Sequence, residues 1–245
     1  MRQFTLSVAE IATSGGQIYV RCGGGPEVTV APGQFYLASR RSSERSEEEA
    51  GIATQPFLRV PLYPFHTRDG GPGFFVDPAH PYAALEPGNT LDLVGPCGRG
   101  FSLPPRAAHL LVVVDTLERL YSLAHLALER HFAVTLLLPP PPGAPLPLED
   151  PRSDATGALP VEVEIQRGTL TADLAAWADL VAVDVPDPFT FTDGIRRLRL
   201  HPPPGFVQAL ITPPMPCGVG ACQACWVEIG HHRKRACVEG PVFHL

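Results

Sequence analysis

The sequence predicts an α+β multidomain fold: an amino-terminal antiparallel β-barrel, a central α/β domain with a parallel sheet, and a cysteine-rich carboxyl-terminal segment. Three observations support this prediction. Short alternating runs separated by glycine and proline turns occupy residues 1–105, as in small barrels. Continuous apolar runs alternate with helix-period segments over residues 106–212, which is typical of a parallel sheet covered by helices. Four of the six cysteines fall within residues 213–245.

Composition and charge limit the classes of function. The chain has 245 residues, of which 44% are hydrophobic, enough apolar material for the cores of two modest domains. Its formal net charge of -6 argues against nucleic acid as a partner. No apolar run reaches the length of a membrane span, and the first ten residues lack a signal-peptide core. We therefore expect a cytoplasmic protein without a membrane partner.

The barrel strands are predicted where the alternation is clearest. They cover residues 4–8, 17–21, 34–37 and 90–94. Residues 39–49 mix both signs of charge without periodicity, which favours a mobile surface insertion. Cys22 and Cys97 stand far apart in the sequence, and we expect them to be free thiols rather than a disulfide.

In the central domain, apolar strands alternate with helices. Strands are predicted at 110–114, 132–138, 161–165, 180–185 and 206–211, with helices at 117–130, 170–178 and 190–198. A proline-rich loop over residues 139–160 separates the first βαβ unit from the rest. Because right-handed crossovers place helices on both faces of such a sheet, we expect three layers.

Acidic residues follow several of these strands. The first strand-to-helix turn contains Asp115 and Thr116 and no glycine, and we expect one of the two to be the helix N-cap. A nucleotide pyrophosphate needs a glycine-rich turn free of negative charge, so NAD(P) is not expected to bind. Asp184, Asp187 and Asp193 lie near later strand ends, where we expect loop and cap residues.

The cysteine spacing indicates the chemistry. Cys217, Cys222 and Cys225 form a C-x4-C-x2-C motif, and Cys237 follows twelve positions later. This is the plant-type spacing of a [2Fe-2S] cluster, which needs four thiolate ligands. The alternatives are a structural zinc site and a disulfide. Zinc sites usually combine two C-x2-C knuckles, and only one is present here.

Glycines and a predicted hairpin accompany the motif. Gly218 and Gly220 allow the loop backbone to wrap closely and to direct N–H groups at the cluster sulfurs. Residues 226–229 alternate like a strand and residues 230–232 have the composition of a turn. A hairpin is therefore predicted to return the chain to Cys237.

The tip of this hairpin, residues 231–235, has the sequence HHRKR. We expect a solvated basic turn, with docking onto an acidic partner as the alternative. Two histidines beside cysteines also raise the Rieske type of centre, in which two histidines replace two cysteines. Four cysteines already complete the ligand set, which argues against that type.

The sequences MPCGVGACQACWVEI and RACVEGPVF resemble the carboxyl-terminal segment of the electron-transfer subunit of two-subunit dihydroorotate dehydrogenases. The resemblance implies that all four cysteines of the motif bind a [2Fe-2S] cluster. Residues 32–35, 85–89 and 95–101 resemble the flavin-binding barrel of the ferredoxin-reductase superfamily, to which that subunit belongs. The resemblance also implies that the central domain is nucleotide-binding-like in fold.

FAD is the barrel cofactor that the resemblance implies, although the chain departs from the family motif. Val60 stands where the family has the arginine that holds flavin phosphates, and Tyr63 where it has a small hydroxyl residue. Pro78 and Ala79 stand where the family has Gly-Thr. Arg59, one residue out of register, could hold the phosphates instead, and Tyr63 could stack on the isoalloxazine ring.

The resemblance implies an electron-transfer subunit of an oxidoreductase, without catalytic residues of its own, that works in a hetero-oligomer. Such a subunit passes electrons through the [2Fe-2S] cluster to or from a flavoprotein catalytic subunit. There are two other hypotheses: the departures at the flavin and nucleotide positions argue for the first, and the missing glycine turn argues against the second. One is a scaffold or docking subunit with relic reductase domains and a cluster-only relay, and the other is a stand-alone NAD(P)H-dependent flavin reductase.

Overall fold

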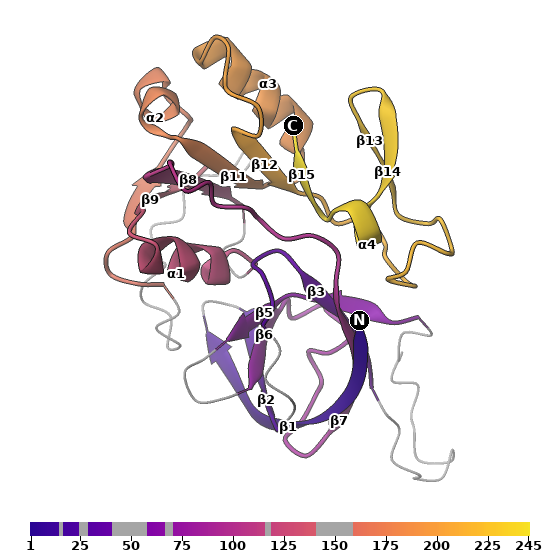
Figure 1. The fold of residues 1–245 in the computed structure, drawn as a ribbon. Helices are drawn as coiled ribbons and strands as arrows, with labels where there is room; N and C mark the ends of the chain where they lie inside the picture. The colour runs from indigo at the N-terminus through magenta and orange to yellow at the C-terminus, as the bar shows by residue number, and fades with distance from the viewer. Residues whose placement is uncertain (15–16, 25–28, 41–57, 67–70, 116–118, 141–158) are drawn as a thin grey trace.

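The computed structural model of the chain describes residues 1–14, 17–24, 29–40, 58–66, 71–115, 119–140 and 159–245. The predicted insertion at 39–49 and the predicted proline-rich loop at 139–160 lie outside these residues, apart from their ends. Figure 1 shows a barrel built from the amino-terminal strands, an α/β layer above it, and the carboxyl-terminal segment alongside both. No helix of the described residues is long and apolar enough to cross a membrane.

The amino-terminal strands form a nearly closed antiparallel barrel. In the described residues the sheet order is β4-β3-β7-β1-β2-β6-β5. The strands are β1 (Arg2–Ser14), β2 (Gln17–Gly23), β3 (Phe35–Arg40), β4 (Val60–Leu62), β5 (Pro64–His66), β6 (Pro72–Val76) and β7 (Thr90–Cys97). Its two edge strands, β4 and β5, are consecutive in the chain with only Tyr63 between them, so this residue lies at the seam of the barrel.

The barrel strands obey the alternation that predicted them. Along β7, every second side chain is buried, and Leu91 and Leu93 pack with Leu6 and Val8 of β1 in the barrel core. The four predicted strands are confirmed, and β1 is longer than expected. The short strands β4, β5 and β6 were not predicted, because each contains a proline, which sequence patterns treat as a strand breaker.

The central domain is a parallel sheet with one antiparallel edge strand, in the order β10-β9-β8-β11-β12-β15. Its strands are β8 (His109–Val114), β9 (Ala133–Leu138), β10 (Glu164–Arg167), β11 (Leu180–Asp184), β12 (Val207–Leu210) and β15 (Val242–His244). Its helices are α1 (Tyr121–Glu129), α2 (Ala172–Trp177) and α3 (Pro188–Leu198). The edge strand β15 comes from the cysteine-rich segment and runs antiparallel to β12.

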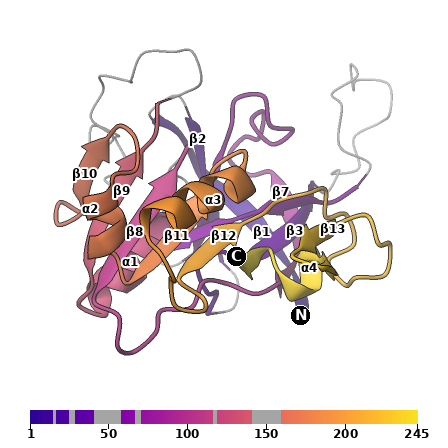
Figure 2. The same ribbon diagram turned by 90° about the horizontal axis from the view of Figure 1, so that it is seen from above.

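Helices cover both faces of this sheet, as predicted. Val112 and Val114 of β8 pack with α1, whereas Leu111 and Val113 pack in a separate core with α2 and α3. Figure 2 shows α2 and α3 across the face of the sheet that is turned away from the barrel. Both faces of β8 are covered by helices, which explains why this strand is apolar at consecutive positions rather than at alternate ones.

Some local predictions are wrong. The strand predicted at 161–165 is β10, which begins only at Glu164. Helix α1 begins at Tyr121 with Leu120 as its N-cap and no side-chain cap, so Asp115 does not cap it; Thr116 lies outside the described residues. Asp187 does cap α3, accepting a hydrogen bond from the Thr190 N–H (3.0 Å), as expected.

The barrel and the central domain share one hydrophobic core. Phe65 and Phe75 of the barrel contact Tyr121 of α1, with ring centroids 5.7 and 5.2 Å apart. On the same face of the sheet, the fully buried Gln208 of β12 holds the connecting segment after the barrel. Its amide accepts from the Ser102 N–H (2.8 Å) and donates to the Ser102 carbonyl (2.7 Å).

Replacing Gln208 should loosen this connection. Gln208→Leu keeps a similar volume but leaves the Ser102 N–H and carbonyl without protein partners, so we expect a loss of about 1–2 kcal/mol of unfolding free energy. That loss corresponds to a decrease of roughly 3–6 °C in Tm, measured by differential scanning calorimetry. In the control Gln166→Leu, which removes only a surface bond to Glu164, Tm should stay unchanged. Equal Tm values for the two variants would contradict the prediction.

Candidate metal centre

The cysteine segment leaves the sheet after β12 and returns to it at β15. Between these strands lie the loop with three cysteines, a hairpin of β13 (Trp226–Ile229) and β14 (His232–Arg235), and α4 (Ala236–Glu239). The hairpin pairs Trp226 with Arg235 and Ile229 with His232, which confirms the predicted hairpin. The Ala236 N–H then donates to the Cys225 carbonyl (2.9 Å), so α4 begins beside the third cysteine.

The four cysteines of the motif form two pairs. Cys217 and Cys222 lie on the loop with their sulfurs 3.2 Å apart. Cys225, at the end of the loop, and Cys237, on α4, are in side-chain hydrogen-bond contact, and both are 1% exposed. Cys237 also interacts electrostatically with Cys217, so the pairs are neighbours. The motif spacing could not reveal this pairing, because it depends on the hairpin that brings α4 back to the loop.

The loop directs backbone N–H groups at the first cysteine. Partial burial raises the pKa of the Cys217 thiol, but hydrogen bonds from the N–H groups of Cys222, Val219 and Ala221 and from the Cys222 side chain together outweigh it and lower that pKa to about 6. In the other pair, burial raises the pKa of Cys237 to about 12, together with its hydrogen bond to Cys225. Anionic sulfur is therefore favoured at the exposed end of the site, whereas the buried pair needs a cation to become thiolate.

This arrangement differs from that of a structural zinc site. In such a site, four side chains converge on one ion. Within the described ranges, no three histidine, cysteine or acidic side chains converge closely enough to hold a single metal ion. Two adjacent pairs of thiols instead match a donor set in which each pair of thiols binds a different metal ion. The residues present therefore fit a dinuclear centre, and soft sulfur donors suit iron.

Two glycines let the loop approach its surroundings. Gly218 has a φ of 67°, and a β-carbon there would lie 2.7 Å from Leu37 Cδ1 and 3.1 Å from Cys97 Sγ. Gly220 has a φ of 75°, and its β-carbon would lie 3.0 Å from Arg235 Nη1. The predicted loop-forming role of both positions thus has a steric basis, because only glycine combines positive φ with so little space.

Cys97 is a neighbour of the site that sequence analysis did not connect with it. Its side chain is 4% exposed, lies at the end of β7, and belongs to the same apolar cluster as Cys225 and Cys237. Cys22 is buried in the barrel core, and both thiols are free, as predicted. No signal in the sequence places Cys97 here, because 120 residues separate it from Cys217 and only the docking of the segment onto the barrel joins them.

The two residues considered for flavin binding are engaged within the protein. Arg59 donates to the Asp92 carboxylate (2.6 Å) and to the Asp92 carbonyl (2.8 Å), so its guanidinium joins β4 to β7. The ring of Tyr63 lies beside Phe35, with centroids 5.9 Å apart, and Arg119 lies over it at 5.9 Å. Its buried hydroxyl has no hydrogen-bond partner among the described residues. The cation and the aromatic surface that a flavin requires are thus occupied, and these residues do not fit that cofactor.

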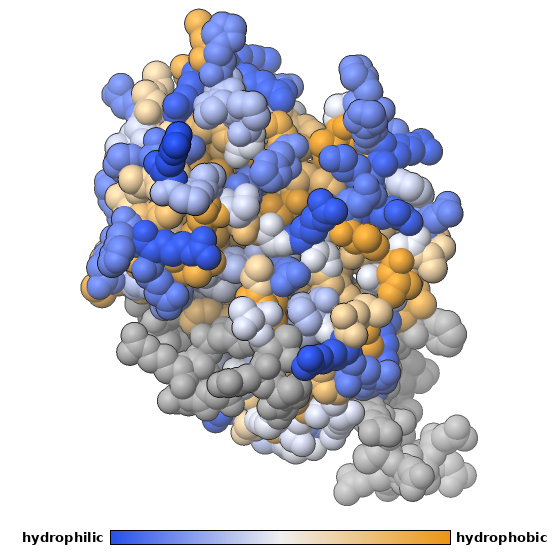
Figure 3. All heavy atoms as spheres, in the orientation of Figure 1, coloured by the Kyte–Doolittle hydropathy of each residue, from blue (hydrophilic) through white to orange (hydrophobic). Residues whose placement is uncertain are grey.

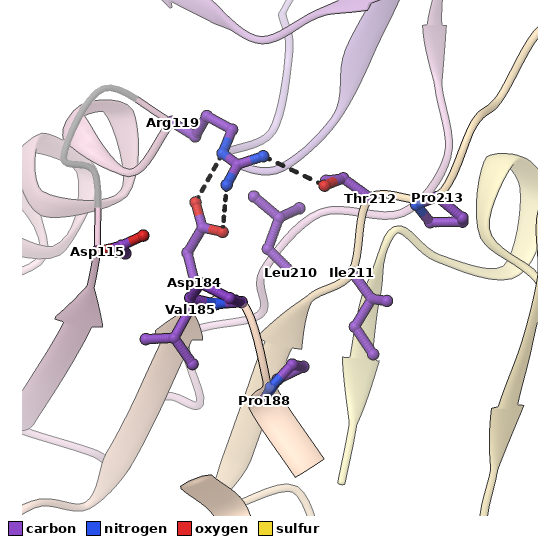
Figure 4. Close-up of a pocket in the computed structure, with 10 residues that line it drawn as sticks. Asp115, Arg119, Asp184, Val185, Pro188, Leu210, Ile211, Thr212 and Pro213 are labelled. Carbon is purple, nitrogen blue, oxygen red and sulfur yellow. Dashed lines mark hydrogen bonds and ion pairs between the residues drawn. The ribbon is translucent and has the colours of Figure 1, made fainter. Parts of the chain in front are cut away.

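A pocket of about 320 Å³ lies at the carboxyl ends of the parallel strands (Figure 4). Arg119 reaches across it and donates to both oxygens of Asp184 (2.7 and 2.8 Å) and to the Thr212 hydroxyl (3.2 Å). Asp184 is 2% exposed, which corrects its assignment as a loop or cap residue. Asp115 also lines the pocket. The pocket thus contains two carboxylates, and Arg119 is already paired with one of them. Binding of a phosphate group is therefore disfavoured there.

Comparison with known proteins agrees with the cysteine geometry. Residues 213–245 match the family described as the iron-sulfur cluster binding domain of dihydroorotate dehydrogenase B. The electron transfer subunit of dihydroorotate dehydrogenase B (NAD(+)) from Desulforamulus reducens is 64% identical over 33 residues. These residues are 12% of this chain and 13% of that protein, so the likeness is confined to the cysteine segment.

Solved structures resemble the whole chain in fold. An NADH-dependent reduced ferredoxin-NADP oxidoreductase has a TM-score of 0.65 at 19% identity, covering 98% of this chain and 87% of that one. The flavohem-like FAD/NAD binding domain of nitric oxide dioxygenase from Vibrio cholerae has a TM-score of 0.60 at 15% identity, with 86% and 98% covered. A ferredoxin NADP+ reductase from Neisseria gonorrhoeae has a TM-score of 0.57 at 13% identity, covering 85% of this chain and 98% of that one. The chain therefore has a ferredoxin-reductase-like fold, and its residues 213–245 match the iron–sulfur cluster binding domain of dihydroorotate dehydrogenase B.

Proposed function

We propose that this chain is an electron-transfer iron–sulfur protein, which holds a [2Fe-2S] cluster through Cys217, Cys222, Cys225 and Cys237. The observation that carries the proposal is the grouping of these four thiols in two adjacent pairs on one loop and one short helix. A dinuclear cluster needs two thiolates for each iron, and the plant-type motif supplies four thiolates. When bound, the cluster supplies one-electron transfer.

The surrounding residues have distinct roles in this proposal. The N–H groups that bond Cys217 stabilise negative charge on sulfur, and such bonds raise a cluster's reduction potential. The buried Cys225 and Cys237 exclude water from one side of the site. Cys222 is exposed, so the site has a short route to the surface, where a partner can approach.

The partner that we propose is a flavoprotein catalytic subunit of the dihydroorotate dehydrogenase type, in a hetero-oligomer. The likeness of the cysteine segment to the electron transfer subunit from Desulforamulus reducens supports it. It is a proposal because that likeness covers 13% of the relative. Electrons then enter or leave this chain through the cysteine loop.

A second candidate is a cluster-only relay in which the reductase domains serve as a scaffold. The ion pair between Arg59 and Asp92, together with the enclosed Tyr63, favours it over a chain that carries its own flavin. The Arg119–Asp184 pair across the strand ends likewise disfavours a stand-alone NAD(P)H-dependent reductase. Both candidates share the cluster and differ in flavin content.

Visible spectroscopy of the anaerobically purified protein tests the cluster. We expect an iron–sulfur spectrum that dithionite bleaches, and its loss in Cys225→Ser, because hydroxyl oxygen is a poor ligand for this centre. Cys22→Ala, which removes a thiol in the barrel core, should keep the spectrum. An unchanged spectrum in Cys225→Ser would refute the ligand assignment. Acid-released flavin, quantified in the same samples, separates the two candidates: about one FAD per chain would exclude the cluster-only relay.

Matched glycine substitutions test the fit of the loop. Gly218→Ala and Gly230→Ala both place a β-carbon at positive φ (67° and 60°), at a cost of about 1–2 kcal/mol each. Only at Gly218 does the new atom also meet Leu37 and Cys97; at Gly230 nothing lies within 4 Å. We expect iron content and Tm to decrease clearly in Gly218→Ala and only slightly in Gly230→Ala. Equal iron content in both variants would show that the close approach does not matter.

A further inference from the structure

Large apolar side chains are exposed around the outer end of the cysteine site. Val219 is 51% exposed, Trp226 40% and Val238 37%, and the exposed Cys222 lies on the same loop. We call these four residues the cluster face. Three of the nine exposed large hydrophobic residues in the described part of the chain thus fall within the short cysteine segment.

Contacts made by Arg235 show that the cluster face is continuous. Its guanidinium lies 5.8 Å from the centre of the Trp226 ring, and its Nη1 donates to the Gly220 carbonyl (3.4 Å). A β-carbon on Gly220 would in turn lie 3.1 Å from Val238 Cγ2. Trp226, the loop and Val238 are therefore adjacent, although they come from β13, the loop and α4.

Basic side chains border this apolar surface. Residues 213–245 hold three basic and two acidic side chains, a formal charge of +1, so the rest of the chain carries -7. Arg233 and Arg235 lie 3.3 and 3.6 Å from Glu228 and Glu239, and no ion pair involves Lys234 within the described residues. Figure 3 shows hydrophobic atoms of this segment below the hydrophilic atoms of the hairpin.

From this geometry we propose that the cluster face docks an acidic redox protein, whose carboxylates meet Arg233 and Lys234 while its apolar centre covers Val219, Trp226 and Val238. This proposal rests on the proposed function and specifies the partner of the same site. An apolar centre with a polar rim is the usual anatomy of a protein interface. The rest of the chain carries a net negative charge whereas this segment carries a net positive one, so electrostatic steering favours an encounter in which Cys222 faces an acidic partner.

The probe partner is an acidic flavodoxin in its fully reduced form, mixed with the oxidised holoprotein in a stopped-flow instrument. One electron passes from the flavin to the iron–sulfur protein, so the flavin is oxidised by one electron as the visible absorbance bleaches. No covalent bond forms or breaks between the proteins. The second-order rate constant is measured at low and at high ionic strength.

Charge is tested with two double variants that remove the same number of cations. Arg233→Gln/Lys234→Gln neutralises the hairpin, and Arg196→Gln/Arg197→Gln neutralises the distant end of α3. We expect the hairpin variant to slow the reaction by about tenfold at low salt, with the difference vanishing at high salt, because steering is screened. The α3 variant should react at the parent rate. Equal slowing in both variants, or none in the hairpin variant, would overturn the proposal.

The apolar centre is tested with Val219→Asn against Leu200→Asn, which changes a side chain that is 80% exposed elsewhere. We expect a several-fold loss of rate in Val219→Asn that persists at high salt, and none in Leu200→Asn. The visible spectrum of each variant is recorded first. A parent protein without an iron–sulfur spectrum would refute the proposed function and this inference together, whereas a normal spectrum with unaltered rates in the variants would refute the docking surface alone.

Discussion

The pairing of β15 with β12 is the constraint on which the cysteine site depends. Leu210, at the end of β12, is the register partner of Val242 in β15, and the Ile211 N–H donates to the Pro241 carbonyl (2.9 Å). Both ends of the intervening segment are therefore fixed at one place on the sheet edge. The loop, the hairpin and α4 start and end at this point of the sheet edge. The fourth cysteine is therefore kept close to the other three.

The same strand also holds the segment against the barrel. The Arg99 N–H donates to the Gly240 carbonyl, and Arg99 forms a β-bridge with Pro241. Gly33 is needed opposite, because a β-carbon there would lie 2.6 Å from Val242 Cγ2 and 3.0 Å from Phe101. The barrel, the sheet and the cysteine segment thus meet at residues 240–242. This contact explains why Cys97, at the end of a barrel strand, packs beside a loop that comes from the other end of the chain.

Two ion pairs join distant parts of the chain, one in the barrel and one at the carboxyl ends of the parallel strands. Arg59 is bound to Asp92 within the barrel, and Arg119 is bound to the buried Asp184 at the strand ends. A buried ion pair is costly to break, because removing one partner leaves an unpaired charge. Because Asp184 is 2% exposed, loss of Arg119 would leave a buried carboxylate without this ion pair.

The sequence by itself determined the elements whose signals are local. Alternation predicted β1, β7 and the first strand of the hairpin, continuous apolar runs predicted β8 and β9, and cysteine spacing predicted the metal centre. The tertiary structure alone decided the rest, because it depends on contacts between distant residues. The burial of Asp184 under Arg119, the engagement of Arg59 by Asp92 and the position of Cys97 beside Gly218 all join segments that are far apart in the chain. Local periodicity carries no information about such pairs: closure of the barrel and packing of the central domain form the two ion pairs, and docking of the cysteine segment onto the barrel places Cys97 beside Gly218.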